Sequence, residues 1–217
     1  RATRQARASA PSWQVESVTA TSHRGAPTGH PPQEGRTREP DTGMAWGTLV
    51  HALLEHAMRG PHRDRAHLER LANWLTMGNP ELRRVVPEAL DTVERVMASD
   101  FWQRALAAEE RLAEVPFAVK LEAVGVPPRI LYGIIDLALR FPAGWELIDY
   151  KTDQLQVEAL ADRYRDQVRQ YADQWARIAE ARVSFAGLYA VRVAELTENF
   201  RSSNAIVLTE YRGLTVA

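Results

Sequence analysis

A stretch that begins at Tyr132, YGIIDLALRFPAGWELIDYKTD, constrains the fold more than any other part of the chain. Its apolar, β-branched and aromatic residues predict two strands joined by a tight turn, at about 129–140 and 145–151. Each strand carries one acid, Asp136 on the first and Asp149 on the second. An apolar hairpin with two carboxylates has to lie where both charges are compensated, and the rest of the chain has to fold around it.

The register of this hairpin decides what lies beside Asp136. If residues 142–143 form the turn, Asp136 lies opposite Asp149, whereas a slip of one or two residues brings Tyr150 or Lys151 opposite instead. Side chains two apart on a strand share a face, so Asp149 and Lys151 point the same way. Cross-strand neighbours are about 5 Å apart, and two carboxylates at that distance repel each other unless a cation or a shared proton lies between them.

This arrangement matches the ligand preference of a hard divalent cation. Mg²⁺ favours carboxylate oxygens and retains several waters, and a neighbouring ammonium can orient a water and offset charge on a phosphate. The alternative is a surface hairpin with an Asp–Lys ion pair, which stabilises a fold little. The flanking segments LYGIIDLAL and WELIDY are apolar and favour burial of Asp136 and Asp149, where unpaired charge is costly.

Lysine is rare in this chain, which makes its positions informative. Of 27 basic residues, only Lys120 and Lys151 are lysines. A genome that favours arginine explains the bias, but the exception at Lys151 indicates that a compact ammonium, rather than a planar guanidinium, is required there.

The composition excludes several classes of site. The chain has no cysteine, which rules out disulfides, cysteine-ligated zinc and an iron–sulfur cluster, and which fits a reducing compartment. It has no apolar run of about 18 residues, so neither a membrane span nor a membrane partner is expected. The formal net charge is −1, so any nucleic-acid surface has to be local.

The 217 residues are enough for one large domain, or for one domain with a tail. Residues 1–41 are rich in Pro, Gly, Ser, Thr and Arg and are predicted to be a flexible linker or tail, with residues 42–217 as the folded domain. The chain starts at Arg1 and has no signal-peptide pattern, so we expect it to be a fragment of a larger protein.

Helical and strand periodicities predict a mixed α/β fold. Apolar positions at helical spacing predict a helix over 44–59, which Gly60 and Pro61 end. The other expected elements are helices at about 63–77, 80–98, 100–112 and 157–181, and strands at about 113–123, 183–192 and 205–212. A strand–helix–strand crossover after the hairpin implies at least one parallel pair in the sheet.

Four short motifs together resemble those of one nuclease family. Residues 133–137 read GIIDL and residues 149–152 read DYKT, which is similar to the G-x-I-D-L and D-Y-K-T signature of PD-(D/E)XK nucleases of the RecB/AddA branch. Residues 47–55, with the pattern G-x-x-x-H-x-x-x-E, resemble the upstream helix of that branch, and residues 167–171 resemble its Q-x-x-x-Y motif. Each motif alone is weak, and their order and spacing along residues 45–171 give the resemblance its weight.

The resemblance implies a restriction-endonuclease-like α/β fold, in which helices flank a mixed sheet and an N-terminal portion is helical. It also implies that Asp136 and Asp149 ligate a metal, with the Tyr150 carbonyl as an additional ligand. Lys151 would position the attacking water, and His51 would supply a nitrogen ligand from its helix. Taken alone, a histidine on a helix face is more often structural.

Further residues are expected to line the site. Gln167 and Tyr171, one helical turn apart, would contact DNA or steady the lysine, although an amphipathic helix that packs an aromatic residue has the same pattern. Tyr164 lies one further turn back, and Glu114 matches an acid on the first strand of this branch, or else a solvated strand-edge acid. Three arginines on the same helix are candidates either for phosphate contacts or for a solvated face: Arg163, Arg165 and Arg169.

The resemblance implies a DNA nuclease that depends on Mg²⁺ or Mn²⁺, with exonuclease activity favoured over endonuclease activity. It would process single- or double-stranded DNA ends in recombination or repair, in the bacterial cytoplasm. Helicase domains would lie in the same full-length chain, and a second helicase–nuclease subunit is a further expected partner. These residues hold no Walker lysine loop, so they are not expected to hydrolyse ATP by that route themselves. The cysteines of the AddB sub-branch are absent, so no iron–sulfur cluster is expected. The alternatives are a non-catalytic DNA-end binding module on the same fold and a stand-alone exonuclease.

Overall fold

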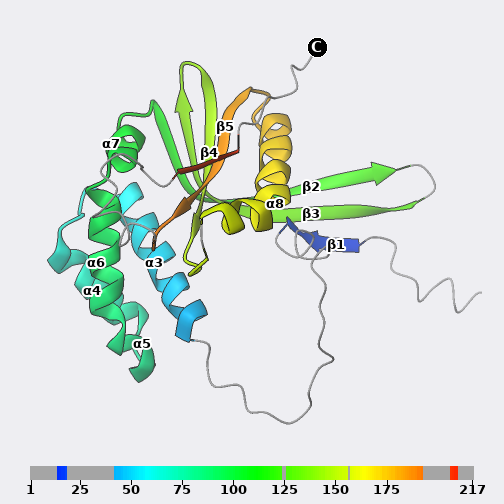
Figure 1. Cartoon of the computed structure of the whole chain (residues 1–217). Coiled ribbons are helices and arrows are strands. Elements are labelled where there is room, and N and C mark those ends of the chain that lie inside the picture. The colour runs from blue at the N-terminus through cyan, green and yellow to red at the C-terminus, as the bar shows by residue number, and fades with distance from the viewer. Residues whose placement is uncertain (1–13, 19–41, 124–125, 156, 193–205, 210–217) are drawn as a thin grey trace, which may run out of the picture.

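The computed structural model describes residues 14–18, 42–123, 126–155, 157–192 and 206–209 (Figure 1). These residues form a mixed six-stranded sheet with flanking helices, which confirms the predicted fold class. The helices are α3 (Thr42–Arg59), α4 (Arg65–Leu75), α5 (Pro80–Arg84), α6 (Val86–Met97), α7 (Asp100–Leu106) and α8 (Val157–Ile178). The strands are β1 (Gln14–Ser17), β2 (Glu110–Ala123), β3 (Val126–Phe141), β4 (Gly144–Lys151), β5 (Val183–Ala190) and β6 (Ile206–Thr209).

The sheet is built around the predicted hairpin, which is β3 and β4. Its order is β1-β3-β4-β5-β6. β1 and β4 pair with different stretches of the same edge of β3, and β2 pairs along the opposite edge. The hairpin has the predicted two-residue turn, because Phe141 pairs with Gly144 and Leu137 pairs with Ile148. Gly144 has a φ of 130°, a backbone conformation that glycine adopts without strain. β4 and β5 are parallel and are connected through α8, which confirms the predicted crossover.

Most predicted elements agree with the structure to within about three residues at each end, and two helices differ more. The helix expected over 80–98 is two helices, α5 and α6, because Pro87 lacks an N–H and its ring would clash with the preceding turn of a continuous helix. The helix expected over 100–112 ends at Leu106, and the chain then joins the sheet. Of the strand expected over 205–212, β6 covers 206–209, and the other residues lie outside the described part of the chain.

Residues 14–18 fall inside the predicted linker, yet they belong to the folded domain. β1 pairs in parallel with residues 129–132 of β3, and Val18 is fully buried in the core beneath α8. The linker prediction is therefore wrong for these residues, and the sheet begins upstream of the predicted boundary at residue 42. Residues 1–13 and 19–41 lie outside the described residues.

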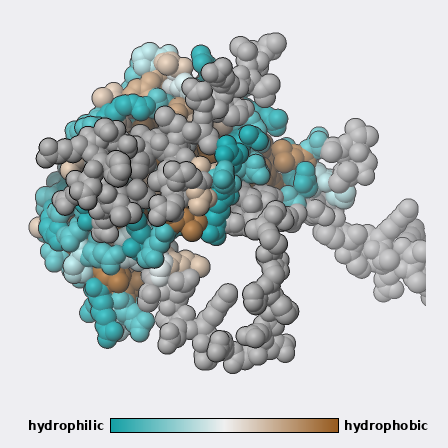
Figure 2. Space-filling view, in the orientation of Figure 1, coloured by the Kyte–Doolittle hydropathy of each residue, from teal (hydrophilic) through white to brown (hydrophobic). Residues whose placement is uncertain are grey.

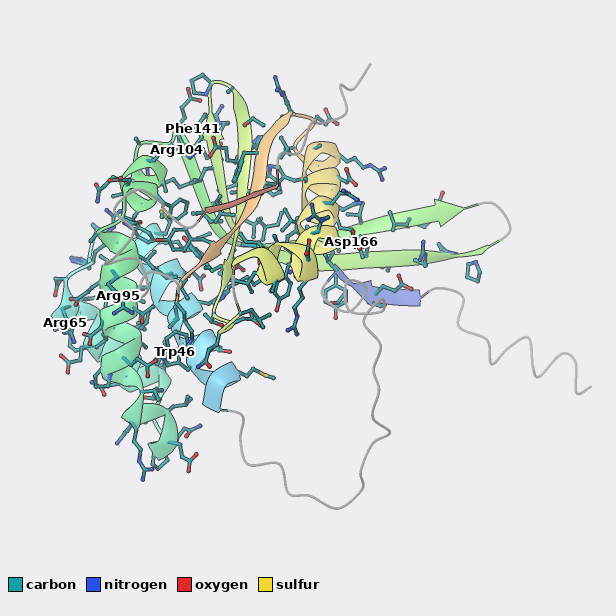
Figure 3. All side chains as sticks on the ribbon, viewed as in Figure 1. Trp46, Arg65, Arg95, Arg104, Phe141 and Asp166 are labelled. Atoms are coloured by element: carbon teal, nitrogen blue, oxygen red, sulfur yellow. The ribbon has the colours of Figure 1, made fainter. Side chains whose placement is uncertain are left out.

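The sheet separates two hydrophobic cores. The first lies beneath α3, α6 and α7 and contains Trp46 on α3 (Figure 3) and Trp102. The second lies beneath α8 and contains Leu160 and Trp175. On the face shown in Figure 2, the parts of the helical layer that are not behind grey atoms are mostly hydrophilic, as expected when each helix turns its apolar face inward. Within the described residues, no helix has both the length and the apolar character that a membrane span needs.

Candidate metal centre and active site

The candidate site lies at a break in the pairing along one edge of β3. On that edge β1 pairs with β3 as far as Tyr132, and β4 pairs with it from Leu137 onward. Between these two positions, no strand of the described chain pairs with this edge. The C-terminal ends of β1 and β4 therefore point toward each other across a gap, and a cavity of about 340 Å³ lies there. Seven predicted site residues line this cavity: His51, Glu114, Asp136, Asp149, Lys151, Gln167 and Tyr171.

β2 and β3 both rotate at the level of this break. Ala113 and its partner Leu137 belong to the core beneath α3. Val115 and its partner Ile135 pack into the core beneath α8. Residues two apart on a regular strand point to the same face, so the two strands turn over between these pairs. Glu114 accommodates the turn with a φ of 49°, a left-handed conformation that costs a non-glycine residue about 1–3 kcal/mol.

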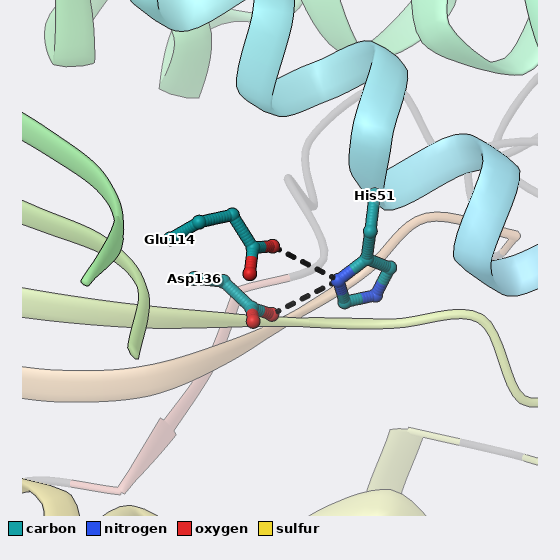
Figure 4. Close-up of side chains that lie close together, drawn as sticks. All are labelled: His51, Glu114 and Asp136. Atoms are coloured by element: carbon teal, nitrogen blue, oxygen red, sulfur yellow. Dashed lines mark ion pairs between the residues drawn. The ribbon is translucent and has the colours of Figure 1, made fainter. Parts of the chain in front are cut away.

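Glu114 and Asp136 meet His51 of α3 at this rotation (Figure 4). His51 Nδ1 lies 3.5 Å from Asp136 Oδ2 and 3.7 Å from Glu114 Oε1. One ligand atom from each of the three residues lies within 4.8 Å of the others, and we refer to these residues as the ligand cluster. Burial lowers the pKa of His51, but Asp136 and then Glu114 outweigh burial and raise this pKa to about 10. Without a bound cation, an imidazolium therefore compensates the two carboxylates.

Asp136 also takes the place of a missing backbone contact between β3 and β4. Its Oδ2 accepts a hydrogen bond from the backbone N–H of Tyr150 at 2.6 Å. This bond fixes the carboxylate beside the end of β4, so the prediction that Asp136 lies next to the Asp149 strand is confirmed. The Tyr150 side chain lies in the core beneath α3, where burial raises its pKa well above the usual range. The Tyr150 carbonyl as a metal ligand stays a prediction.

Lys151, which also lines the cavity, is held by three groups. Its Nζ lies 2.6 Å from Asp149 Oδ2 and 3.4 Å from Gln167 Oε1. The same ammonium lies 4.0 Å from the ring centroid of Tyr164. Gln167 Nε2 donates to Asp149 Oδ1 at 3.3 Å and to the Tyr171 hydroxyl at 3.0 Å. Gln167 thus contacts both the lysine and the aspartate, which fits the steadying role that the sequence left open for it.

Burial and mutual attraction together set the protonation of the Asp149–Lys151 pair. Burial raises the pKa of Asp149 and Lys151 opposes it, which leaves this pKa at about 6. Burial lowers the pKa of Lys151, but Asp149 outweighs burial and raises it, so the lysine remains an ammonium. Asp149 Oδ2 lies at ion-pair distance from Lys151, yet among the described residues it has no hydrogen bond of good geometry.

The donor set of the cavity fits a divalent cation. One imidazole nitrogen and two carboxylates converge in the ligand cluster, and Asp149 adds a buried carboxylate, one oxygen of which pairs with Lys151. Oxygen donors of this kind suit Mg²⁺ and Mn²⁺, and the imidazole adds a donor that Mn²⁺ accepts more readily than Mg²⁺ does. A cation would also relieve the repulsion among the acids.

Tyr164 lies behind Lys151 and is not among the residues that line the cavity. Its hydroxyl donates to both carboxylate oxygens of Asp153 at 3.1 Å, which holds its ring over the ammonium. The three arginines that the sequence offered for phosphate contacts instead pair with acids, which supports the solvated-face alternative. These pairs are Arg163 with Asp153, Arg165 with Asp162, and Arg169 with Asp166 of α8 (Figure 3).

The contacts that join α3 to the end of β4 were not predicted from the sequence. A Cβ on Gly47 would stand 2.6 Å from Thr152 Oγ1, so helix and strand end touch there. Arg192, just after β5, donates from Nε to the Thr152 carbonyl at 2.9 Å. Its guanidinium carbon lies 3.6 Å from the ring centroid of Trp46. Gly47 and Thr152 stand in two of the motifs and could have been paired, whereas Arg192 carries no signal of its own.

Four residues that line the cavity were not predicted as site residues: Ser17, Tyr132, Gly133 and Ile134. The last three stand in or beside the GIIDL motif, whereas Ser17 lies far from every motif. It is the last residue of β1 and lines the cavity. A strand of four residues within a Pro- and Gly-rich segment is too short to show a period-two pattern. No sequence signal could therefore have placed Ser17 at the site.

Comparisons of the sequence with known proteins find relatives in several bacteria. Curated relatives from Acetivibrio thermocellus, Exiguobacterium sibiricum and Levilactobacillus brevis are each named as one of the subunits of an ATP-dependent helicase/nuclease. They are 29%, 26% and 31% identical to this chain over 142, 179 and 170 residues, which is 58%, 72% and 69% of the chain. The chain spans only 11%, 15% and 13% of the length of these relatives. The model of the PD-(D/E)XK nuclease superfamily matches residues 21–210, and the chain therefore belongs to that superfamily.

Proposed function

We propose that this chain is the metal-dependent nuclease domain of a bacterial helicase–nuclease and that it hydrolyses DNA phosphodiester bonds. The observation that carries the proposal is the position of Lys151. Asp149 and Gln167 hold its ammonium in the same cavity as the ligand cluster. A surface ion pair would need neither burial nor a second group to fix the lysine.

In the proposed reaction, the residues of the cavity have two separate roles, which are metal binding and orientation of the attacking water. The ligand cluster and Asp149 would hold one or two Mg²⁺ or Mn²⁺ ions, which supply positive charge to the phosphate and lower the pKa of water. Lys151 orients the attacking water by donating to it from a fixed position, because Asp149 and Gln167 restrict the ammonium. The same ammonium offsets negative charge that develops on the phosphate.

The relatives support the larger context of the proposal. Their name joins a helicase to a nuclease, and this chain spans at most 15% of the length of those compared. Helicase domains would then lie in the remainder of the full-length chain, with DNA ends as the substrate. A second subunit, the exonuclease mode, a role in recombination or repair and the cytoplasmic location stay predictions.

A nuclease assay tests the proposal. Wild type and Asp149→Ala are incubated with labelled single- and double-stranded DNA in Mg²⁺, in Mn²⁺ and in chelator. We expect wild type to cleave only with a cation, and Asp149→Ala to lose cleavage while its melting curve stays cooperative. Full activity in chelator would refute the metal-dependent reaction. DNA binding without cleavage under all conditions would favour the non-catalytic DNA-end binding module.

A further inference from the structure

Tyr132 and Ile134 expose large apolar side chains at the edge of the cavity. They are 47% and 49% exposed, respectively, and both line the cavity beside Asp136. Their neighbours Leu131 and Ile135 pack into the core beneath α8. Because side chains alternate along a strand, Tyr132 and Ile134 lie on the opposite face of β3 from α8.

This face continues directly from the proposed catalytic residues. Tyr132 and Asp136 are four residues apart on β3, a distance of about 13 Å along a strand. The partners of Ile134 and Tyr132 on β2 are Pro116 and Ala118, which are also exposed. On the other edge Ser17 of β1 is the partner of Tyr132. We refer to Tyr132, Ile134, Pro116 and Ala118 as the apolar track.

The apolar track is chemically unsuited to a phosphate backbone. From Asp136 to Tyr132, neither β3 nor the partner residues on β2 and β1 place a lysine or an arginine on this face. A protein surface that follows the backbones of a duplex neutralises phosphates with basic side chains. An aromatic ring with flat apolar neighbours instead offers a platform on which nucleobases stack.

We infer that the apolar track receives the unpaired bases of single-stranded DNA next to the scissile phosphate, with Tyr132 stacked on a base. The inference rests on the proposed function and names its substrate class. In a duplex the bases are paired and stacked on one another, so they cannot present their faces to Tyr132. The distance from Asp136 to Tyr132 corresponds to about four nucleotides at the spacing of a stacked strand, and to fewer in an extended strand.

Two oligonucleotides of equal length separate base contacts from backbone contacts. One is ordinary labelled single-stranded DNA, and the other is a fully abasic strand that keeps the phosphodiester backbone. Affinity is measured by fluorescence anisotropy in chelator, and kcat/KM is measured in Mg²⁺. The variants are Tyr132→Ala, Tyr132→Phe and, as a matched control, Trp74→Ala, which alters an exposed aromatic residue on α4 away from the cavity.

Tyr132→Ala should weaken binding of ordinary DNA about tenfold, because the stacking of one base on an aromatic ring has that order of effect. The ratio of wild-type to variant affinity should shrink toward one for the abasic strand. Tyr132→Phe should retain most of the affinity, since the ring remains, and Trp74→Ala should bind both strands as wild type does.

Two results would overturn the inference. One is a Tyr132→Ala variant that binds ordinary DNA as tightly as wild type. The other is an equal loss on both strands, with or without a lower melting temperature, because Tyr132 would then shape the protein rather than contact bases. Binding in chelator needs no catalysis, so a wild type that binds but never cleaves would refute the proposed function and still test the apolar track.

Discussion

Gly47 lies so close to Thr152 that a Cβ on the glycine would stand 2.6 Å from the threonine hydroxyl oxygen. Gly47 precedes His51 by about one helical turn, and Thr152 directly follows Lys151. The contact therefore fixes the separation between the helix that carries the histidine and the strand that carries the lysine. Two motifs that are distant in the sequence meet at this point.

Gly47→Ala should lower both the melting temperature and the nuclease activity, although alanine is a better helix former by about 1 kcal/mol. The added methyl group would push α3 away from Thr152 and shift His51 relative to Lys151. We expect kcat/KM to fall about tenfold or more. The double variant Gly47→Ala/Thr152→Ala removes the opposing hydroxyl and should recover part of the loss. A single variant as stable and active as wild type would show that the contact is loose.

Arg192→Lys should reduce kcat more than it changes KM, because Arg192 positions the end of β4 and does not line the cavity. A lysine cannot both cover the Trp46 ring and donate to the Thr152 carbonyl as the planar guanidinium does. Arg165→Lys, on the surface of α8, is the matched control and should behave as wild type. Kinetics on one DNA substrate at saturating Mg²⁺ measure both constants. An unchanged kcat would remove Arg192 from any positioning role.

Lys151→Arg should lose about 100-fold in kcat although the charge is kept. Nζ is enclosed by Asp149, Gln167 and the Tyr164 ring, and a guanidinium is too wide for that position. Lys120→Arg is the matched control, since Lys120 is the other lysine of the chain and pairs with Glu122 on the surface. If both variants cleave DNA at the wild-type rate, the rarity of lysine carries no functional meaning.

Asp149 should make the stability of the metal-free protein fall as the pH rises. Its pKa is about 6 in the folded protein, above its ordinary value of 3.8, so between these values the folded state binds more protons than the unfolded state. Ionisation of Asp149 therefore costs stability from about pH 4 upward. The difference in melting temperature between Asp149→Asn and wild type should shift in favour of the variant as the pH rises from about 4 to 7.5 in chelator. The exposed Asp162→Asn should show no such trend, and a flat difference for Asp149→Asn would contradict the burial effect.

Mn²⁺ binding at about pH 7.5 should release close to one proton from His51, because only the neutral imidazole ligates. Asp136 and Glu114 outweigh burial and raise the pKa of His51 to about 10, so the protonated ring stabilises the metal-free fold fully below pH 6.5 and loses this effect as the pH rises through 10. From an ordinary histidine pKa, the sequence predicts competition between proton and metal only below about pH 6. Mn²⁺ titration calorimetry in two buffers of different ionisation enthalpy measures the proton count.

His51→Gln should bind Mn²⁺ more weakly and release fewer protons, and the loss of activity should be greater in Mg²⁺ than in saturating Mn²⁺. Equal affinity and equal proton release would remove His51 from the ligand cluster. The roles proposed for Asp149 and Lys151 would remain, because their contacts do not include His51.

Local sequence chemistry predicts the hairpin well. A two-residue turn sets the register, and the structure confirms it from Phe141 and Gly144 to Leu137 and Ile148. The sequence could not show that the backbone pairing of β3 with β4 ends at Asp136. There the Asp136 carboxylate, rather than a backbone carbonyl, accepts the hydrogen bond from the Tyr150 N–H. The left-handed conformation of Glu114 could not be predicted from the sequence either. It arises where β2 and β3 turn over, so that the residues before and after Glu114 pack into different hydrophobic cores.

Helices were predictable where an apolar stripe is long, and least predictable at their ends. α3 and α8 follow the expected periodicity, whereas Pro87 divides the helix expected over 80–98. Arg192 could not be assigned, because its partners come from α3 and from the end of β4, which only the tertiary structure brings together.

β1 shields a strand edge that would otherwise be open beside the cavity. It pairs with residues 129–132 of β3, next to the exposed side chains of Tyr132 and Ile134. An unpaired edge with apolar neighbours is a template for strands of other molecules, and it promotes aggregation. A chain trimmed at residue 42, where the composition alone would place the boundary, would lose this shield together with Ser17. Residues 14–17, which lie in a segment of linker-like composition, are thus expected to protect the folded domain from self-association through this edge.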